Sequence, residues 1–353
     1  MSKLKIAVIG VGNISESHIG GYLKNENVEL YAFCDINEQT LKAKGKKYGI
    51  TRLYTSLDEM LSDLPEIDAV SVCTWNVAHA ECTIKALNAG KHVLCEKPMA
   101  MNADEATAMI EASKKSGKKL MIGFVRRFGN DAAIATDFIN GGSLGDIYYA
   151  KATYLRRNGC PGGWFADKRY SGGGPLIDLG VHVIDLVRYL MGCPNPVSVY
   201  GATYDNIGNR KGLKDKPGYT VRSNQDMVHN VEDMATALIR FDNGATLSVE
   251  ASFNLNIKKD VGEIQLFGTA GGATLSPEFE LYTDVNGYLA NVSLDRPTAL
   301  SFSGLFENEI NYYAESILED RDLSSIAEDG RTLMKILDAI YLSASEKREV
   351  LIK

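Results

Sequence analysis

Short apolar runs alternate with amphipathic segments along the first 123 residues of the chain. The runs lack polar alternation, which is typical of strands buried on both faces of a parallel sheet, and they cover residues 5–9, 28–34, 69–73, 92–95 and 120–124. The segments between them space their apolar residues as amphipathic helices do, over residues 13–23, 37–48, 77–89 and 103–116. Asn37 is a good N-cap for the second helix, and Gly90 and Gly117 follow two helices where C-caps occur. Strands that alternate with helices in this way predict a doubly wound parallel α/β domain.

The pattern changes after residue 124. A helical segment over residues 130–140 precedes an alternating strand, a glycine-rich stretch and a second helical run over residues 178–190. Further segments follow: strand-like ones over residues 197–204, 234–241, 245–253 and 262–267, and helical ones over residues 307–318 and 330–345. Asp242-Asn243-Gly244, between two of these strands, is a hairpin-turn signal. We therefore expect a second, α+β domain with a large, mostly antiparallel sheet.

This division predicts one domain over residues 1–123 and another over residues 124–353, with the last helix, 330–345, free to pack back on the first. A chain of 353 residues is long for one hydrophobic core, which agrees with two domains. Its formal net charge of −7, without a long run of Lys or Arg, argues against a nucleic-acid partner.

The first residues, the apolar runs and the cysteines do not point to export or membrane insertion. No apolar run has the length that a bilayer requires, and the first residues lack the layout of a signal peptide. The six cysteines form no CxxC pair, and three of them end apolar runs. We therefore expect no membrane partner and a reduced, cytoplasmic setting.

A dinucleotide-binding fingerprint follows the first predicted strand. The segment Gly10-Val11-Gly12-Asn13-Ile14-Ser15 is G-x-G-x-x-G with Ser in the third glycine position, and it opens the first helix. Gly10 permits the tight turn, and Gly12 lets a pyrophosphate approach the backbone. The N–H groups and dipole of the helix N-terminus, beginning at Asn13 and Ile14, favour that anion. The pattern predicts a Rossmann-type NAD site, and the alternative is a glycine-rich turn of another doubly wound fold.

Asp35 bears on the choice of cofactor. It ends the second strand, twenty residues past Ser15, where a ribose-binding carboxylate is expected. A carboxylate accepts hydrogen bonds from the ribose hydroxyls of NAD but repels a 2′-phosphate, and Ile36 and Asn37 supply no cation. The sequence therefore predicts a preference for NAD over NADP.

Two other segments carry ionisable groups suited to acid–base chemistry. Lys97 follows the strand that ends with Cys95-Glu96, and ligands bind at the carboxyl ends of strands in open α/β sheets. Asp178 and His182 lie one turn apart if the helical run begins at Asp178. His titrates near neutrality and can act as general base, whereas a lysine ammonium can stabilise a developing alkoxide. A buried hydrogen-bonded Asp–His pair remains an alternative, and a metal site that also uses Asp185 is weakly indicated, so we expect no metal.

These motifs together resemble the Gfo/Idh/MocA oxidoreductases, which include glucose–fructose oxidoreductase and inositol dehydrogenase. The resemblance rests on Gly10-Val11-Gly12, Glu96-Lys97-Pro98 and the Gly172-Gly173-Gly174…Asp178…His182 segment, and it extends to Thr74-Trp75-Asn76 and His79. It implies a Rossmann domain followed by an α/β domain on a large antiparallel sheet, with Lys97 as the catalytic lysine before a cis peptide at Pro98.

The resemblance also assigns roles around the nicotinamide. It implies that Asp178 and His182 face the substrate and the nicotinamide, and we take His182 as the residue that accepts the proton. It implies that Thr74, Asn76 and Glu96 contact the cofactor. Trp75 departs from the family pattern, which has proline at this position, and Ser15 is a smaller departure.

Substrate contacts are expected beyond the last strand of the first domain. Arg126 or Arg127 is predicted to bind substrate oxygens, with an interdomain salt bridge as an equal alternative. Trp164 is predicted to lie against a sugar face, or else to anchor the glycine-rich loop. His79 and His229 are interpreted as structural.

The sequence thus predicts an NAD-dependent dehydrogenase acting on a CH–OH carbon of a cyclitol, a sugar or a sugar derivative. Two alternatives use the same scaffold: an NAD-dependent glycosidase that retains its cofactor, and a non-catalytic NAD-binding regulator. The free face of the second-domain sheet predicts a homodimer or homotetramer.

Overall fold

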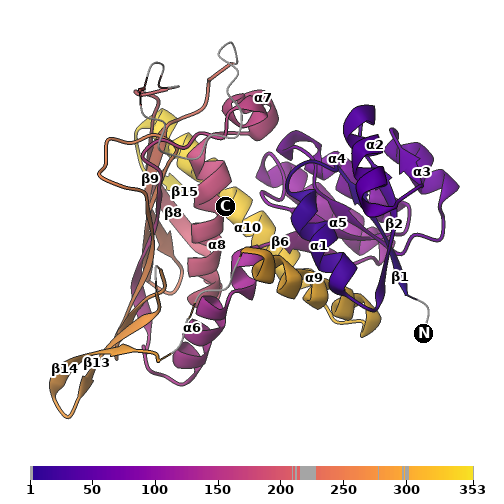
Figure 1. Cartoon of the computed structure of the whole chain (residues 1–353). Helices are drawn as coiled ribbons and strands as arrows, with labels where there is room; N and C mark the ends of the chain where they lie inside the picture. Colours follow the sequence, from indigo (N-terminus) through magenta and orange to yellow (C-terminus); the bar gives the residue numbers. More distant parts are fainter. Residues whose placement is uncertain are drawn as a thin grey trace. The chain divides into compact units, whose positions relative to one another are not determined.

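The computed structural model describes residues 3–208, 210, 213–214, 228–276, 278–295, 298 and 302–352. The contacts within the chain divide it into two compact units (Figure 1). One unit comprises Met1–Phe128 and Ser301–Arg331, and the other comprises Gly129–Leu300 and Thr332–Lys353.

The first unit is built on a six-stranded parallel sheet. Its strands, in chain order, are β1 (Leu4–Ile9), β2 (Val28–Cys34), β3 (Leu53–Tyr54), β4 (Ala69–Val72), β5 (His92–Glu96) and β6 (Leu120–Gly123). They lie side by side in the order β3-β2-β1-β4-β5-β6, which is the Rossmann order. Every residue of β4 and β6 is buried, including the one polar residue, Ser71, as expected for strands covered on both faces. The prediction of a doubly wound parallel domain is confirmed.

Seven helices of the described chain belong wholly to the first unit. They are α1 (Ser15–Lys24), α2 (Glu38–Tyr48), α3 (Leu57–Asp63), α4 (Asn76–Asn88), α5 (Ala103–Ser116), the 3-10 helix η1 (Val125–Phe128) and α9 (Phe302–Leu318). Asn37 caps α2 as predicted, because its side chain accepts the N–H of Thr40 at 2.9 Å. Gly117 ends α5 in the left-handed conformation, also as predicted.

The placement of α9 differs from the predicted domain boundary. The second domain was predicted over residues 124–353, with the helix over residues 330–345 free to pack back on the first. In the structure, residues 301–331 group with the first unit and residues 332–353 with the second. The buried face of α9 explains this, since Ile310, Tyr313 and Ala314 join a core that contains Tyr22 of α1. The boundary between the units falls inside α10 (Ser324–Glu346).

The second unit is built on a nine-stranded sheet. Its strands are β7 (Ile147–Leu155), β8 (Pro196–Tyr204), β9 (Met234–Phe241), β10 (Thr246–Ser252), β11 (Val261–Gly268), β12 (Gly272–Thr274), β13 (Glu280–Val285), β14 (Tyr288–Ser293) and β15 (Val350–Leu351). All neighbours are antiparallel except β7 and β10. The predicted hairpin joins β9 to β10, where Gly244 has a φ of +85° and donates its N–H to the Phe241 carbonyl at 3.0 Å.

The second unit also contains α6 (Asn130–Asn140), the 3-10 helix η2 (Gly163–Ala166), α7 (Lys168–Ser171), the π-helical turn η3 (Leu176–Gly180) and α8 (Val181–Leu190). Of these, η3 packs on β7 and β10, and α8 packs on β7 and β11. Figure 1 shows α8 running along the sheet. Along β9, Ala235, Ala237 and Ile239 are buried, whereas Leu238 between them is exposed. This alternation leaves the opposite face of the sheet uncovered within the described chain.

None of the described helices contains a segment that is long and apolar enough to cross a bilayer.

Candidate cofactor and catalytic sites

The turn after β1 is shaped for a phosphate. Gly10 has a φ of +81°, and a Cβ added to it would lie 2.7 Å from the Cys73 carbonyl oxygen, so glycine is required there. Gly12 is exposed, and a Cβ on it would meet no atom within 4 Å. The turn therefore presents open backbone at the position where a pyrophosphate is expected.

The N-terminus of α1 lies directly behind this turn. Its N-cap residue, Ile14, makes no side-chain capping hydrogen bond, and the N–H groups of Glu16 and Ser17 donate to the carbonyls of Asn13 and Ile14 at 3.2 and 3.0 Å. The positive end of the helix dipole therefore lies at this turn, where it favours an anion. Ser15 is fully buried, and its hydroxyl donates to the Gly12 carbonyl at 2.7 Å. Ser in the third glycine position therefore fits, since its one polar atom has a partner inside the turn.

Asp35 is fixed beside the same turn. One carboxylate oxygen accepts the N–H of Val11 at 2.8 Å, and the other accepts the N–H of Asn37 at 2.7 Å. A carboxylate offers about four lone-pair sites, so these two bonds orient it and leave capacity for ribose hydroxyls. The residues present fit a bound NAD at its pyrophosphate and ribose.

The segment after β4 departs from the family pattern without changing the backbone. Trp75 has φ −72° and ψ 152°, values that proline also adopts, and its side chain is 44% exposed. Asn76 begins α4 and is buried, and Thr74 is half-buried. Trp75 therefore replaces proline without strain in the turn.

His79 joins this segment to the one that holds Lys97. Its Nδ1 lies 2.7 Å from the Pro98 carbonyl oxygen, and its Nε2 lies 3.2 Å from the Thr74 carbonyl oxygen. Burial lowers the pKa of this imidazole. The interpretation of His79 as structural agrees with these contacts.

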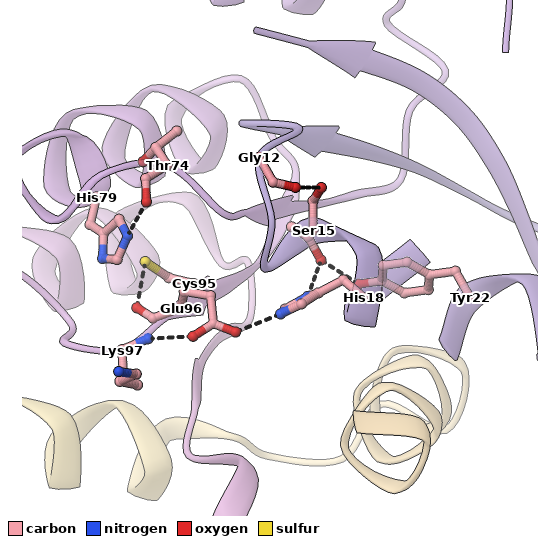
Figure 2. Close-up of polar contacts among 10 residues, drawn as sticks. Gly12, Ser15, His18, Tyr22, Thr74, His79, Cys95, Glu96 and Lys97 are labelled. Carbon is pink, nitrogen blue, oxygen red and sulfur yellow. Dashed lines mark hydrogen bonds and ion pairs between the residues drawn. The ribbon is translucent and has the colours of Figure 1, made fainter. Parts of the chain in front are cut away.

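Lys97 stands at the carboxyl end of β5, half-buried, and the peptide bond to Pro98 is cis as the resemblance implied. The preceding Glu96 is buried and uses both carboxylate oxygens (Figure 2). One lies 2.7 Å from Nε2 of His18, and the other accepts the backbone N–H of Lys97 at 3.2 Å. Burial acts to raise the pKa of Glu96, but the hydrogen bond from His18 and the charge of Lys97 outweigh it, so the pKa lies below its usual value.

In the second unit, Asp178 lies in the π-helical turn and His182 in the first turn of α8. The prediction of one α-helix over residues 178–190 is therefore wrong at its start. The two residues are half-buried, whereas the residues between and immediately around them are buried. Asp178 and His182 thus mark the open side of an otherwise buried segment.

Glu232 supports the start of that segment. It is buried, and its carboxylate accepts the N–H groups of Gly174 at 3.0 Å and Leu176 at 3.2 Å and the hydroxyl of Tyr341 at 2.9 Å. Burial raises its pKa. A Cβ on Gly174 would collide with the Glu232 carbonyl oxygen, which explains the glycine there.

The candidate substrate residues differ in their surroundings. Arg127 forms a salt bridge at 2.9 Å with Asp329 inside the first unit, and both side chains are nearly buried. Arg127 therefore forms a salt bridge, as the alternative prediction stated. The bridge lies within one unit and not between two. Arg126 is half-buried in η1. Trp164 stacks on Phe165 with ring centroids 3.9 Å apart.

No group of three or more metal-ligating side chains occurs among the residues that the structure describes. Asp185, the third member of the weakly indicated metal set, is buried on α8.

Sequence reasoning missed two residues that the structure places beside the predicted ones. His18 is 78 positions from its partner Glu96, and Glu232 is more than 50 positions from Gly174 and Leu176. The one available signal for His18 was its position on the buried side of α1 between Ser15 and Tyr22, which are also buried. Glu232 lies outside any periodic segment and gave no such signal.

Two family models together match most of the chain. The model described as an oxidoreductase family with an NAD-binding Rossmann fold matches residues 4–124, and the GFO/IDH/MocA C-terminal domain matches residues 133–274.

Relatives and solved structures extend the match to full length. D-glucoside 3-dehydrogenase of Escherichia coli K12 is 35% identical over 348 residues, covering 97% of this chain and 96% of that protein. Levoglucosan dehydrogenase of Pseudarthrobacter phenanthrenivorans is 30% identical over 301 residues, covering 79% and 75%. A solved levoglucosan dehydrogenase in complex with NADH has a TM-score of 0.87 at 25% identity, with 100% of both chains covered. The resemblance stated from the motifs is thereby confirmed, and the chain belongs to the Gfo/Idh/MocA oxidoreductases, with the NAD-binding Rossmann fold of that family in its first 124 residues.

Proposed function

We propose that this enzyme is an NAD-dependent dehydrogenase that moves a hydride between the nicotinamide and a CH–OH carbon of a sugar, a cyclitol or a sugar derivative. One observation carries the proposal. The phosphate turn, Asp35, the Thr74–Asn76 segment and Lys97 follow β1, β2, β4 and β5, so they share one edge of the parallel sheet. That edge, where the strand order reverses between β1 and β4, is where open α/β sheets bind dinucleotides.

The chain's own residues divide the work of holding the cofactor. Gly10, Gly12, Asn13 and Ile14 would receive the pyrophosphate, and Asp35 the ribose hydroxyls. Thr74, Asn76, Glu96 and Lys97 would lie toward the nicotinamide end. Bound NAD supplies the hydride acceptor. The carboxylate of Asp35 gives NAD the advantage over NADP, because a 2′-phosphate beside it would meet like charge.

The acid–base chemistry is assigned to Lys97, Asp178 and His182. His182 takes the hydroxyl proton as the hydride leaves the same carbon, so the C–H and O–H bonds break while the carbonyl forms. Lys97 donates a hydrogen bond to the reacting oxygen and stabilises its developing negative charge. Asp178, one turn from His182, orients the imidazole or the substrate hydroxyl.

The relatives favour a carbohydrate as substrate. Those named above are a D-glucoside 3-dehydrogenase and a levoglucosan dehydrogenase. We assign substrate contacts to Asp178, His182 and Arg126, with Trp164 offering an aromatic face. Arg127 is a weaker candidate, since its guanidinium already pairs with Asp329.

We also propose that the uncovered face of the second sheet joins copies of the chain into a dimer or tetramer. Leu238 and Tyr200 are cross-strand partners on β9 and β8, and both are exposed on that face. A monomer measured by light scattering after size exclusion would contradict this assignment.

A screen for NADH release tests the proposed function. The enzyme with NAD⁺ is offered methyl glucosides, levoglucosan, inositols, aldoses, sugar acids and amino sugars. We expect release of NADH with at least one of them, and a loss of about 100- to 10,000-fold in Lys97→Ala and in His182→Ala. Lys85→Ala, which removes a lysine of α4 paired with Asp58 and Glu81, is the matched control.

The same screen separates the alternatives. An NAD-dependent glycosidase would cleave nitrophenyl glycosides without releasing NADH, and a regulator would bind NAD without turnover. Near-native rates in Lys97→Ala would remove the proposed role of that lysine.

A further inference from the structure

We propose that His18 is a positioning residue for Lys97, and that it acts through the Glu96 carboxylate. The inference rests on the proposed function, because it assumes that Lys97 works at the reacting oxygen. It assigns a role in that reaction to a helix α1 residue that the chemistry described above does not use.

The first observation in support is that the two carboxylate oxygens of Glu96 have different partners. One oxygen faces Nε2 of His18 at 2.7 Å, and the other accepts the backbone N–H of Lys97 at 3.2 Å. Figure 2 shows Glu96 lying between the two residues, with the Lys97 side chain extending beyond it. Any shift of the carboxylate toward or away from His18 would therefore move the backbone from which the lysine side chain projects.

The second support is that His18 is itself held from behind. Its Nδ1 lies 3.3 Å from the Ser71 hydroxyl, which lies 2.6 Å from the Tyr22 hydroxyl, and all three residues are buried. If Nε2 of His18 carries the hydrogen, every donor has an acceptor: Tyr22 donates to Ser71, Ser71 to Nδ1, and Nε2 to Glu96. A series of hydrogen bonds in which each group donates to the next holds the imidazole ring in one orientation. The oriented ring in turn holds the Glu96 carboxylate in place.

The third support is that stability is a weak reason for this pair to exist. Both side chains are almost completely buried, at 0% exposure for His18 and 7% for Glu96. Replacing such a pair by apolar residues is often neutral or stabilising. The His18–Glu96 pair lies beside Lys97 and can position that lysine, which an apolar pair could not do.

The titratable groups that interact electrostatically with Glu96 come from several elements. They are His18 on α1, Cys73 after β4, His79 on α4, Cys95 on β5, Lys97 after β5 and Glu309 on α9. Glu309 is fully buried and has no hydrogen-bond partner among the described residues. Burial and the nearby charge of Glu96 raise the pKa of Glu309 well above its usual value, which favours its protonated form, whereas the lowered pKa of Glu96 favours its ionised form.

Removing His18 should therefore change the protonation of Glu96 in a predictable direction. Without the imidazole, burial dominates, and Glu96 takes up its proton at a higher pH than in the native chain. A protonated Glu96 would hold the Lys97 backbone differently, so the acid limb of the kcat profile should move to higher pH.

The experiment compares the native chain with His18→Leu, His18→Gln, Glu96→Gln and the double variant His18→Leu/Glu96→Gln. With the best substrate of the screen, we expect kcat to fall about 10- to 100-fold in His18→Leu, in line with the cost of small misplacements. KM and the affinity for NAD⁺ should change little. His18→Gln, whose amide can still donate to Glu96, should recover part of kcat.

Two further readouts make the test decisive. Carbon-13 NMR of glutamate-labelled protein without cofactor, with Glu96→Gln to assign the signal, should show Glu96 protonating at higher pH in His18→Leu. In the double variant, the loss of kcat should not exceed that of Glu96→Gln alone, because the effect passes through that carboxylate.

The control is Ile19→Val, which changes a fully buried neighbour of His18 on the same helix. Additive losses in the double variant, an unmoved Glu96 titration, or an equal shift in Ile19→Val would overturn the inference. Full activity in Lys97→Ala would instead overturn the proposed function, so the two failures are distinguishable.

Discussion

At the scale of single residues, the Asp35 carboxylate is held before any cofactor binds. Two backbone N–H groups, from Val11 and Asn37, orient it at 2.8 and 2.7 Å. Such preorganisation lowers the entropy that ribose binding would otherwise cost.

The choice of cofactor can be tested at this residue. Asp35→Ala should lower the ratio of kcat/KM for NAD to that for NADP by about 10- to 100-fold, the equivalent of the ~1.5–3 kcal/mol that hydrogen bonds to a charged group contribute. Steady-state kinetics with both cofactors measures it, and an unchanged ratio would contradict the assignment. KM for the carbohydrate serves as the internal control.

Single residues also show where sequence reasoning stops. The cofactor residues Gly10, Gly12 and Asp35 could be predicted because the fingerprint is local, with each member at a fixed distance from the first strand. The partnership of His18 with Glu96 is not local. It depends on the sheet order, in which the chain passes from β3 on one side of β1 to β4 and β5 on the other. The pattern of apolar residues does not predict which side chains that order brings together.

At the scale of elements, periodicity located most helices to within a few residues and failed where the backbone leaves the regular period. The predicted helix over residues 103–116 and strand over residues 234–241 match the structure at both ends. The short elements β3 and α3 were missed, because two and seven residues are too few to show a period. The π-helical turn at Asp178 was missed because its extra residue per turn is invisible in a mostly apolar sequence.

The backbone at the start of that π-helical turn is held by the carboxylate of Glu232, which comes from a distant segment. Glu232 takes the N–H groups of Gly174 and Leu176, which would otherwise be buried without acceptors. The geometry of Asp178 therefore depends on Glu232.

Glu232→Ala should destabilise the protein by ~1–3 kcal/mol, the cost of leaving buried donors unsatisfied. It should also lower kcat more than Tyr341→Phe, which removes only the third partner of the same carboxylate. Chemical denaturation and steady-state kinetics give the two values. Equal effects of the two substitutions on kcat would show that the N–H contacts do not position Asp178.

At the scale of the whole molecule, the two sheets and their order along the chain were predicted. A return to the first domain was predicted for the helix over residues 330–345, whereas residues 301–331 are the ones that return. Residues 301–331 rejoin the first unit through the buried face of α9. The sequence of an amphipathic helix shows that the helix has an apolar face, but it does not show which hydrophobic core that face will join. Lys97, Asp178 and His182 were predicted as one acid–base set from the chemistry of their side chains and from the family resemblance, because an apolar pattern does not show which distant segments meet.

The central claim, hydride transfer from a carbohydrate carbon, has a direct test. The substrate found in the screen is prepared with deuterium on its ring carbons and incubated with NAD⁺, and the released cofactor is examined by proton NMR. The account predicts released NADH that carries deuterium at C4 of the nicotinamide, formed by the native chain and lost with Lys97→Ala. Substrate consumed while no deuterium reaches C4 of released cofactor would contradict it.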